Sequence, residues 1–334
     1  MGNVTIRMLA EKLQLSAATV SKALNNSHEI SEDTRRRVLA LAAEYNYVPN
    51  PYAGSLRKKI SNTIGVVIPE VADNFFAQAI NGIEAIAQEK KYHVLIYLTH
   101  ESYEKEQFIL RDFQGGRVDG ILLSVSAETP GAQHVRELQE KGIPVVLFDR
   151  ILDEVDTTCI MTDDRDSAYK ATAHLLQCGC KKIALLSVSD SLWISNKRRE
   201  GYQQALAAHH VPFEAADVLH CCNNEAANYA LIREALQQGG YDGVIASVER
   251  LSTIVYGVCA ELQKRIPEDI KVLGFSNLSA APYLNPSLTT ITQPAFDMGK
   301  AAATALFRAL KHKQLPKVET MVLPSRLIVR HSTV

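Results

Sequence analysis

The sequence predicts a small all-α domain with a helix-turn-helix, followed by a two-lobed α/β domain built on two doubly wound parallel sheets. Two observations lead to this fold class. Up to Tyr47 the chain is punctuated as three short helices, and beyond Ser61 short apolar runs alternate with helical segments. The alternation starts again after Cys159, which indicates a second sheet.

Three hydroxyl residues mark the starts of the N-terminal helices. Thr5, Ser16 and Ser31 each precede an apolar-periodic stretch and can cap it. The predicted helices then cover 6–13, 17–24 and 32 to about 45. Apolar residues at three- and four-residue spacings form the expected core, namely Ile6, Leu9, Leu13, Val20, Leu24, Ile30, Val38, Leu41 and Ala42.

The second of these helices has an unusual outer face. Its outward positions hold small or hydroxylated residues and one cation, namely Ala17, Ala18, Thr19, Ser21 and Lys22. A face that only keeps a helix soluble more often carries Glu and Lys pairs. A helix that enters the DNA major groove needs low bulk, hydroxyls for phosphates and a long donor for base edges. The short turn before this helix therefore fits a helix-turn-helix in which the second helix reads DNA.

The charge is unevenly distributed along the chain. Residues 1–60 hold nine Lys or Arg and five Asp or Glu, a net charge of +4, whereas the rest holds 27 and 32, a net charge of −5. A basic head on an acidic body is expected when one end meets a polyanion, although a solvated charged surface explains the +4 equally well.

The region beyond Ser61 consists of repeated strand and helix units. Nearly continuous apolar runs such as T-I-G-V-V-I-P, V-D-G-I-L-L-S and K-K-I-A-L-L-S are typical of buried parallel strands. Helices are predicted between them at 75–90, 103–114, 131–141, 167–178, 197–209, 225–238 and 251–264. A further helix at 295–311 and short strands near 319–323 and 326–329 follow. Sheets of this kind bind ligands beyond the C-terminal ends of their strands.

Composition and motifs exclude several classes of protein. The 334 residues are 46% hydrophobic and 22% charged, as in ordinary globular proteins. The start lacks an apolar run with a cleavage site, Ile6 stands where a myristoylation signal needs Ser or Thr, and no stretch reaches the roughly 18 apolar residues of a membrane span. We therefore expect a cytoplasmic protein with no membrane partner.

No motif for catalysis or metal binding stands out. The chain has no P-loop, no G-x-S-x-G elbow and no H-E-x-x-H helix. Asp163 and Asp164 could pair for metal or acid–base work, but acids at a strand end more often cap a helix. His209 and His210 are adjacent and diverge on a helix, and the six cysteines lack C-x-x-C spacing. We expect no enzyme, no metal, no cofactor and reduced cysteines.

Three N-terminal stretches stand in a fixed order: V-T-I-R-M-L-A-E-K-L-Q-L-S-A-A-T-V-S-K-A-L-N-N, S-E-D-T-R-R-R-V and A-E-Y-N-Y-V-P-N. They resemble the DNA-binding domain of the lactose-repressor (LacI-type) family of bacterial transcription regulators, and the layout of the rest of the chain is similar to that family. The resemblance implies a DNA-binding domain at 1–48, a hinge helix at 49–60 and a periplasmic-binding-protein-like effector and dimerisation domain at 61–334. It also implies that the chain crosses three times between an N-lobe (about 61–161 plus 292–321) and a C-lobe (about 162–291 plus 322–334).

The resemblance further implies which head residues meet DNA. Base-edge contacts are expected from Ala17, Ala18 and Lys22, phosphate contacts from Thr5, Ser16, Thr19, Ser21, Asn25 and Thr34, and a backbone contact from Tyr47. Other members of the family have larger polar side chains at these two positions. Ala17 and Ala18 could make at most methyl contacts with thymine, so Lys22 carries more of the base recognition in this chain. Thr34 as a helix-start hydroxyl and Tyr47 as a core-edge aromatic are equally good explanations of those residues.

The segment 48–59, V-P-N-P-Y-A-G-S-L-R-K-K, has the start and end signals of a helix, but we expect this helix to form only when DNA and the partner chain stabilise it. Asn50 is a suitable N-cap, Pro51 suits the first helical position, and three cations suit the far end. It is shorter than the roughly 12 residues an isolated helix needs, and Gly54 costs about 1 kcal/mol more. The resemblance implies that Leu56 intercalates in the minor groove, with the other hinge contacts from Asn50, Tyr52, Ala53 and Arg57.

The resemblance places an effector pocket between the lobes. The matching positions include Asn74, Phe75, Phe76, Asp149, Arg150, Arg198, Glu249 and Ser276, and Trp193 is a further aromatic candidate for the pocket. A guanidinium and a carboxylate both suit vicinal hydroxyls, and aromatic rings cover a sugar face. Phe75, Phe76 and Trp193 are equally explained as core residues. Sugar- and purine-responsive relatives commonly carry Asn-Asp in place of Val248 and Glu249 and Asp in place of Ser276, which puts recognition of a simple monosaccharide in doubt.

The expected function is a homodimeric, sequence-specific DNA-binding transcriptional regulator, with repression favoured, that a small-molecule effector controls. A carbohydrate or a derivative is the expected effector, and double-stranded operator DNA the expected macromolecular partner. Two alternatives stay open at this point. One is a solute-binding protein without DNA function, which would need an export signal and no basic head, and the other is a DNA-binding regulator whose cleft takes no sugar.

Overall fold

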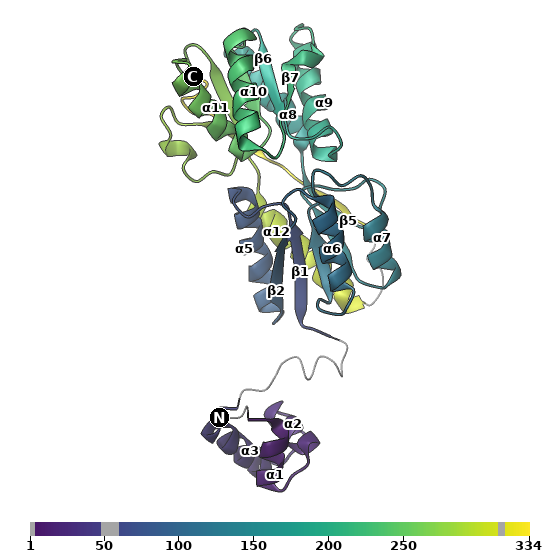
Figure 1. Ribbon diagram of the computed structural model, residues 1–334. Helices are drawn as coiled ribbons and strands as arrows, with labels where there is room; N and C mark the ends of the chain where they lie inside the picture. Colours follow the sequence, from purple (N-terminus) through teal and green to yellow (C-terminus); the bar gives the residue numbers. More distant parts are fainter. Residues whose placement is uncertain (1–3, 48–59, 313–317) are drawn as a thin grey trace. The chain divides into compact units, whose positions relative to one another are not determined.

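The computed structural model describes residues 4–47, 60–312 and 318–334, which form two compact units, 1–61 and 62–334. Figure 1 shows their elements, and each unit is considered by itself. The predicted hinge helix lies outside the described residues, as do the hinge contacts Asn50, Tyr52, Ala53, Leu56 and Arg57.

The first unit is a three-helix domain. It contains α1 (Ile6–Leu13), α2 (Ala17–Leu24) and α3 (Glu32–Glu44), and the predicted caps are present. The hydroxyls of Thr5, Ser16 and Ser31 accept hydrogen bonds from backbone N–H groups three residues on, at 3.3, 3.0 and 3.3 Å. Its small core is formed by buried Leu9, Ala10, Val20, Ala23, Val38 and Ala42.

The second unit contains two six-stranded sheets. The N-lobe sheet is parallel throughout, in the order β11-β5-β4-β3-β1-β2. Its strands are β1 (Thr63–Ile68), β2 (His93–Leu98), β3 (Gly120–Leu123), β4 (Val145–Phe148), β5 (Thr158–Thr162) and β11 (Thr320–Leu323). The helices α5 (Asn74–Glu89) and α12 (Ala295–His312) cover one face, and α6 (Tyr103–Phe113) and α7 (Gln133–Glu140) cover the other.

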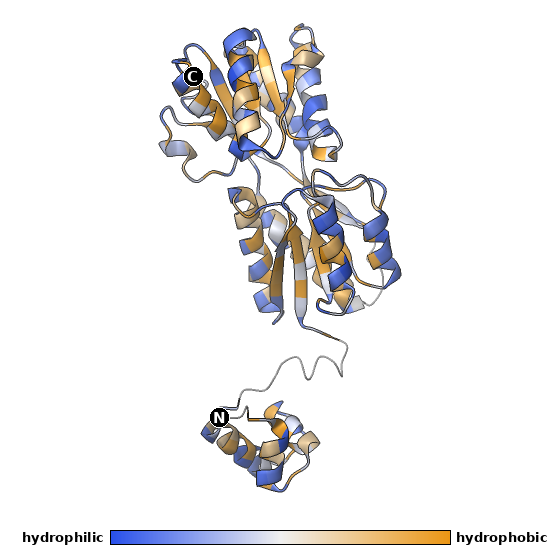
Figure 2. Ribbon diagram, viewed as in Figure 1, coloured by the Kyte–Doolittle hydropathy of each residue, from blue (hydrophilic) through white to orange (hydrophobic). Residues whose placement is uncertain are grey.

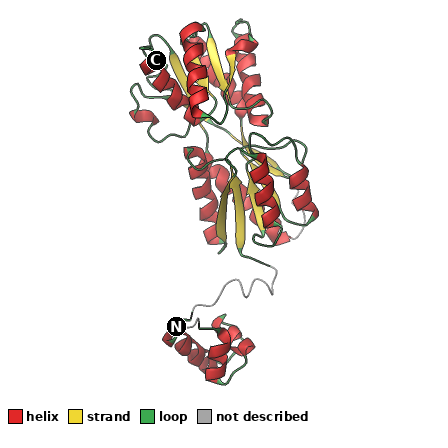
Figure 3. Ribbon diagram, in the orientation of Figure 1, coloured by secondary structure: helices red, strands yellow, loops and turns green. Residues whose placement is uncertain are grey.

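The C-lobe sheet has the order β12-β10-β9-β8-β6-β7, and β12 is antiparallel to β10. Its strands are β6 (Ile183–Ser187), β7 (Val218–His220), β8 (Gly243–Ala246), β9 (Lys271–Phe275), β10 (Thr289–Thr292) and β12 (Arg326–Ile328). The helices α8 (Asp164–Gln177) and α9 (Trp193–Ala208) cover one face, and α10 (Glu225–Gln238) and α11 (Glu249–Glu261) cover the other. Two short 3₁₀ turns, Ala215–Asp217 and Ala281–Tyr283, complete the lobe. Figure 3 shows helices outside strands in both lobes.

The chain passes between the two sheets three times. It leaves the N-lobe sheet after β5, returns after β10, and leaves it again between β11 and β12. The last crossing takes two residues, Pro324 and Ser325. Each lobe is therefore completed by a strand from the final part of the described chain.

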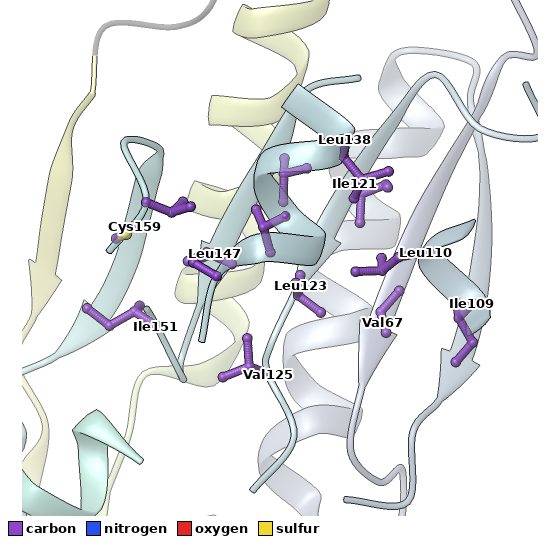
Figure 4. Close-up of a cluster of buried hydrophobic side chains, with 14 of the residues drawn as sticks. Val67, Ile109, Leu110, Ile121, Leu123, Val125, Leu138, Leu147, Ile151 and Cys159 are labelled. Carbon is purple, nitrogen blue, oxygen red and sulfur yellow. The ribbon is translucent and has the colours of Figure 1, made fainter. Parts of the chain in front are cut away.

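Apolar residues fill both faces of each sheet, which explains the nearly continuous apolar runs of the strands. Figure 2 shows mostly orange strands between helices in which blue and orange residues alternate. One N-lobe cluster, drawn in Figure 4, joins Val67, Leu110, Ile121, Leu138 and Leu147, all at most 1% exposed. No helix in the described part of the chain is long and apolar enough to cross a membrane.

The two helices on one face of the N-lobe sheet cross at very close range. A Cβ added at Gly82 in α5 would lie 2.1 Å from the Phe296 carbonyl oxygen, and one added at Gly299 in α12 would lie 2.0 Å from that of Ala79. A similar approach occurs in the C-lobe, where a Cβ at Gly201 in α9 would lie 2.0 Å from the Arg165 carbonyl oxygen. Glycine lets the backbones touch at these three points.

Candidate functional site

The predicted DNA-reading helix α2 presents small residues to solvent. Ala17 and Ala18 are exposed, Thr19 and Ser21 are half-buried, and the side chain of Lys22 is 50% exposed. Ser16 caps the helix, and its hydroxyl lies 2.8 Å from that of Thr19. The exposed face therefore has the low bulk and the single long donor that major-groove reading requires.

The sequence alone did not indicate the partner of Lys22. Its ammonium is hydrogen-bonded to the carboxylate of Glu29, which lies in the loop after α2. Both side chains are about half exposed, so the pair is a surface ion pair of small net stability. Glu29 is thus the partner that holds the Lys22 ammonium beside the loop after α2.

The other predicted DNA contacts in the head also have structural partners. Thr5 caps α1, and the Asn25 side chain donates to the Ser21 carbonyl at 2.9 Å, where α2 ends. Thr34 accepts from the Ser31 hydroxyl at 2.9 Å, and Tyr47 packs against the small core. The two explanations offered for Thr34 and Tyr47 thus both stay open.

A cavity lies between the lobes of the second unit, at the C-terminal ends of strands from both sheets. The volume open to the centres of water molecules is about 50 Å³. Seven predicted effector residues line it, namely Phe75, Phe76, Asp149, Arg150, Arg198, Glu249 and Ser276. Asn74 lies at its edge through a hydrogen bond to Glu249. Trp193 is not in the lining: it packs against the N-lobe cluster of Figure 4, with the Lys197 ammonium 5.7 Å from its ring centroid.

Glu249 joins the two lobes across this cavity. One carboxylate oxygen accepts from the Asn74 backbone N–H at 3.2 Å and from its side-chain amide at 2.7 Å. The other oxygen accepts from the Ser276 hydroxyl and the Asn277 N–H, both at 3.0 Å. Asn277 also exchanges hydrogen bonds of 3.1 and 3.4 Å with Gln78 of α5. The contacts between the lobes at this point are therefore hydrogen bonds of polar side chains, which water or a ligand can replace.

Both arginines of the cavity are occupied by protein acceptors. The Arg198 guanidinium donates to Asp164 at 2.9 Å from Nε and 2.8 Å from a terminal nitrogen, donates to the Ser247 carbonyl, and lies 4.0 Å from the Phe275 ring centroid. The Arg150 guanidinium makes a two-pronged pair with Glu101 at 2.7 and 3.0 Å. Burial would raise the pKa of Glu101, but Arg150 outweighs it and holds that pKa below its ordinary value.

Two carboxylates of the cavity lack such partners. Asp149 is 6% exposed, and in the described part of the chain its nearest cation is Arg150 Nε at 4.0 Å. Burial raises the pKa of Asp149 to about 6. Burial, and then the nearby Glu249, raise the pKa of Asp73, which precedes α5. Asp149 has a φ of +63°, a conformation that Asp and Asn adopt more readily than other non-glycine residues.

Several residues in and behind the cavity lining were not predicted from the sequence. The lining also includes Asp73, Ser195, Ser247, Asn277 and Gln293, and the supporting acids Glu101 and Asp164 lie behind it. These five lining residues lie just after a strand or at the start of a helix, so position in the βα units was the available signal. Within residues 4–47, 60–312 and 318–334, no cluster of three His, Cys, Asp or Glu side chains could hold a metal ion.

The chain matches two family models. Residues 5–50 match "bacterial regulatory proteins, lacI family", and residues 61–324 match "periplasmic binding proteins and sugar binding domain of LacI family". Among curated proteins it is 29% identical to the ribose operon repressor of Halalkalibacterium halodurans, over 98% of this chain and 97% of the relative. It is 28% identical to catabolite control protein A of Priestia megaterium, over 99% of each. A solved LacI family transcriptional regulator from Enterococcus faecium with bound ribose is 28% identical, with a TM-score of 0.72 over 81% of this chain and 98% of that one.

Proposed function

We propose, because the chain belongs to the LacI family of bacterial regulatory proteins, that it is a transcriptional regulator that binds operator DNA through its N-terminal domain and responds to a small molecule bound between its lobes. The observation that carries the proposal is the union, in one chain, of the exposed small-residue face of α2 and the polar interlobe cavity. The DNA-reading face of α2 would have no function in a periplasmic solute-binding protein.

Ala17, Ala18 and Lys22 read base edges in this proposal, and Thr5, Ser16, Thr19, Ser21, Asn25, Thr34 and Tyr47 contact the DNA backbone. Asn50, Tyr52, Ala53, Leu56 and Arg57 of the hinge act in the minor groove, and two heads of a homodimer meet two half-sites. The domain boundaries are those given by the resemblance, with the hinge at 49–60. The protein acts in the cytoplasm and catalyses no reaction.

The effector binds in the cavity, contacting Asp149, Arg150, Arg198, Glu249 and Ser276 among others. Relatives named for ribose support a sugar or a sugar derivative as its class. A cavity of about 50 Å³ holds only a few water-sized molecules, so the lobes must part at the contact between Asn74 and Glu249 to admit a sugar. Binding then changes operator affinity by favouring one lobe arrangement over another.

The test begins with selection of bound fragments from genomic DNA by the purified full-length protein. Operator affinity is then measured by fluorescence anisotropy with and without candidate sugars. The proposal requires a recurrent pseudo-palindromic site and a ligand that changes affinity for it. Equal affinity for selected and random duplexes would overturn it.

A further inference from the structure

We propose that the effector of this cleft carries a positively charged amino group among its hydroxyls, as an amino sugar does. The inference rests on the function proposed above and narrows its ligand class. It follows from which charged groups of the cavity are already engaged by the protein and which are free to meet a ligand.

Three carboxylates line the cavity, those of Asp73, Asp149 and Glu249, together with two guanidiniums, those of Arg150 and Arg198. Each guanidinium is paired with a further carboxylate behind the lining, Glu101 for Arg150 and Asp164 for Arg198. Five carboxylates and two guanidiniums give this group a formal net charge of −3.

Neighbouring cations do not cancel this charge. Arg250, beside Glu249 on α11, donates to the side chain of Asn223 at 2.7 Å and to the Cys222 carbonyl, outside the cavity lining. Counting it still leaves an excess of two negative charges. A phosphate or carboxylate on a ligand would face carboxylates, with both lining guanidiniums already engaged.

Two buried side chains of the cavity have no hydrogen-bond partner among the residues that the structure describes. Asp149 is 6% exposed, and no donor within the described residues satisfies its carboxylate. The Ser247 side chain is 3% exposed, lines the same cavity, and its hydroxyl has no partner in the described part of the chain. Buried polar groups are normally hydrogen-bonded, so a carboxylate that accepts no hydrogen bond, with only the Arg150 guanidinium 4.0 Å away, and a hydroxyl without a partner indicate a ligand that brings donors.

An ammonium group answers both features, since it supplies three donors and one positive charge. The edge-packed rings of Phe75 and Phe76, with centroids 5.2 Å apart, form an apolar wall that suits the C–H face of a sugar ring. Glu249 has two donors from each lobe and already has its acceptor capacity used. Of the two other lining carboxylates, Asp73 is only half-buried whereas Asp149 is 6% exposed, so we assign the selection for the amino group to Asp149.

The test uses full-length protein at pH 7 and a matched panel: D-glucose, D-glucosamine, N-acetyl-D-glucosamine and D-glucose 6-phosphate, with the same series for galactose. Affinities are measured by calorimetry, and specific operator binding without ligand is measured separately by anisotropy. We expect at least one amino sugar to bind about tenfold or more tightly than its neutral and N-acetyl counterparts, and the phosphates not to bind.

Asp149→Asn should reduce that preference to less than threefold, because it removes the charge and keeps the shape. Asn tolerates the φ of +63° at this position, so the variant should fold. Asp153→Asn is the matched control: this acid is exposed, lies in the same loop and is outside the cavity lining, and the preference should persist.

Equal or better binding of neutral sugars or phosphates would overturn the inference, as would an amino preference that survives in Asp149→Asn. Binding of none of the panel by a protein that still recognises its operator would also overturn it. Absence of specific operator binding both without ligand and with every sugar of the panel would instead contradict the function proposed above.

Discussion

The side-chain amide of Asn74 donates a 2.7 Å hydrogen bond to the carboxylate of Glu249 and thereby links the first turn of α5 in one lobe to the first turn of α11 in the other. The same carboxylate receives Ser276 and Asn277 from its own lobe. One side chain thus satisfies donors on both sides of the cleft, and the relation between the lobes depends on it.

Glu249→Ala should destabilise the body. The substitution leaves the Asn277 N–H and the Ser276 hydroxyl without their acceptor in a buried site, which costs about 1–3 kcal/mol of unfolding free energy. Urea unfolding followed by circular dichroism measures this. Exposed Glu268→Ala is the control, and an equal effect of the two changes would contradict the bridging role.

Lys22→Ala should lower the preference for the selected operator over random duplex by roughly 1–3 kcal/mol, because Lys22 is the one long donor on the exposed face of α2. Competition anisotropy at fixed salt concentration gives this difference. Lys91→Ala, at an exposed position in the body, should leave it unchanged. A Lys22→Ala protein with undiminished preference would show that α2 is not the reading helix.

Leu56→Ala should weaken operator binding while the body remains folded, since a shorter side chain cannot hold base steps apart. Helix content measured by circular dichroism should rise when operator is added to the parent protein, and rise less in the variant. Leu56 lies outside the described residues, so this stays a prediction from the sequence. Unchanged affinity would contradict it.

Asp149 should make folding stability depend on pH. Burial raises its pKa from 3.8 to about 6, so between these values the folded protein holds a proton that the unfolded chain has released. The contribution of this group to stability is therefore greatest below about pH 4 and falls as the pH rises through 6, by about 3 kcal/mol. Asp149→Asn should lack this loss, so its stability relative to the parent should increase from pH 4 to pH 7 in urea unfolding. Asp153→Asn should follow the parent, and parallel curves for parent and Asp149→Asn would contradict the assignment.

Gly82→Ala should destabilise the N-lobe by about 1–3 kcal/mol, because the new methyl group would lie 2.1 Å from a backbone carbonyl oxygen of α12. Gly257→Ala provides the matched control. That glycine is also helical, but its added Cβ would meet only the Tyr229 ring at 3.5 Å, so the higher helix propensity of Ala should stabilise by about 1 kcal/mol. The two substitutions should therefore shift the thermal midpoint in opposite directions.

Local signals in the sequence predicted the head well. The caps Thr5, Ser16 and Ser31 act over three residues, and each helix begins where its cap predicts. The third helix ends at Glu44, one residue before the expected end. In the body, α9 begins at Trp193 rather than near 197, and α8 at Asp164 rather than near 167. Asp163, for which the sequence suggested a capping role, does stand at the N-cap position of α8, but its side chain makes no capping hydrogen bond. The N-cap residue of α9 is Leu192, which has no side-chain acceptor, so the sequence carried no signal for that start.

Much of the lining of the interlobe cavity was predictable from the sequence, but the pairing of its side chains was not. The family resemblance indicated Asp149, Arg198 and Glu249. It did not indicate that Asp164 would pair with Arg198 or that Asn74 would donate to Glu249. These contacts join residues up to 175 positions apart, and their distances depend on how the lobes meet. Local sequence patterns carry no information about such pairs.

The two short strands β11 and β12 have a consequence for biosynthesis. β11 pairs with β5 in one sheet, and β12 pairs with β10 in the other, with two residues between them. While the ribosome is still making the chain before Thr320, both sheets lack an edge strand, and β5 and β10 have an open side. During synthesis, the two lobes therefore receive their last strands almost together, because only two residues separate β11 from β12. The regulator should thus become able to bind ligand in a single late step. Until then, the open edges of β5 and β10 are the expected binding sites for a chaperone.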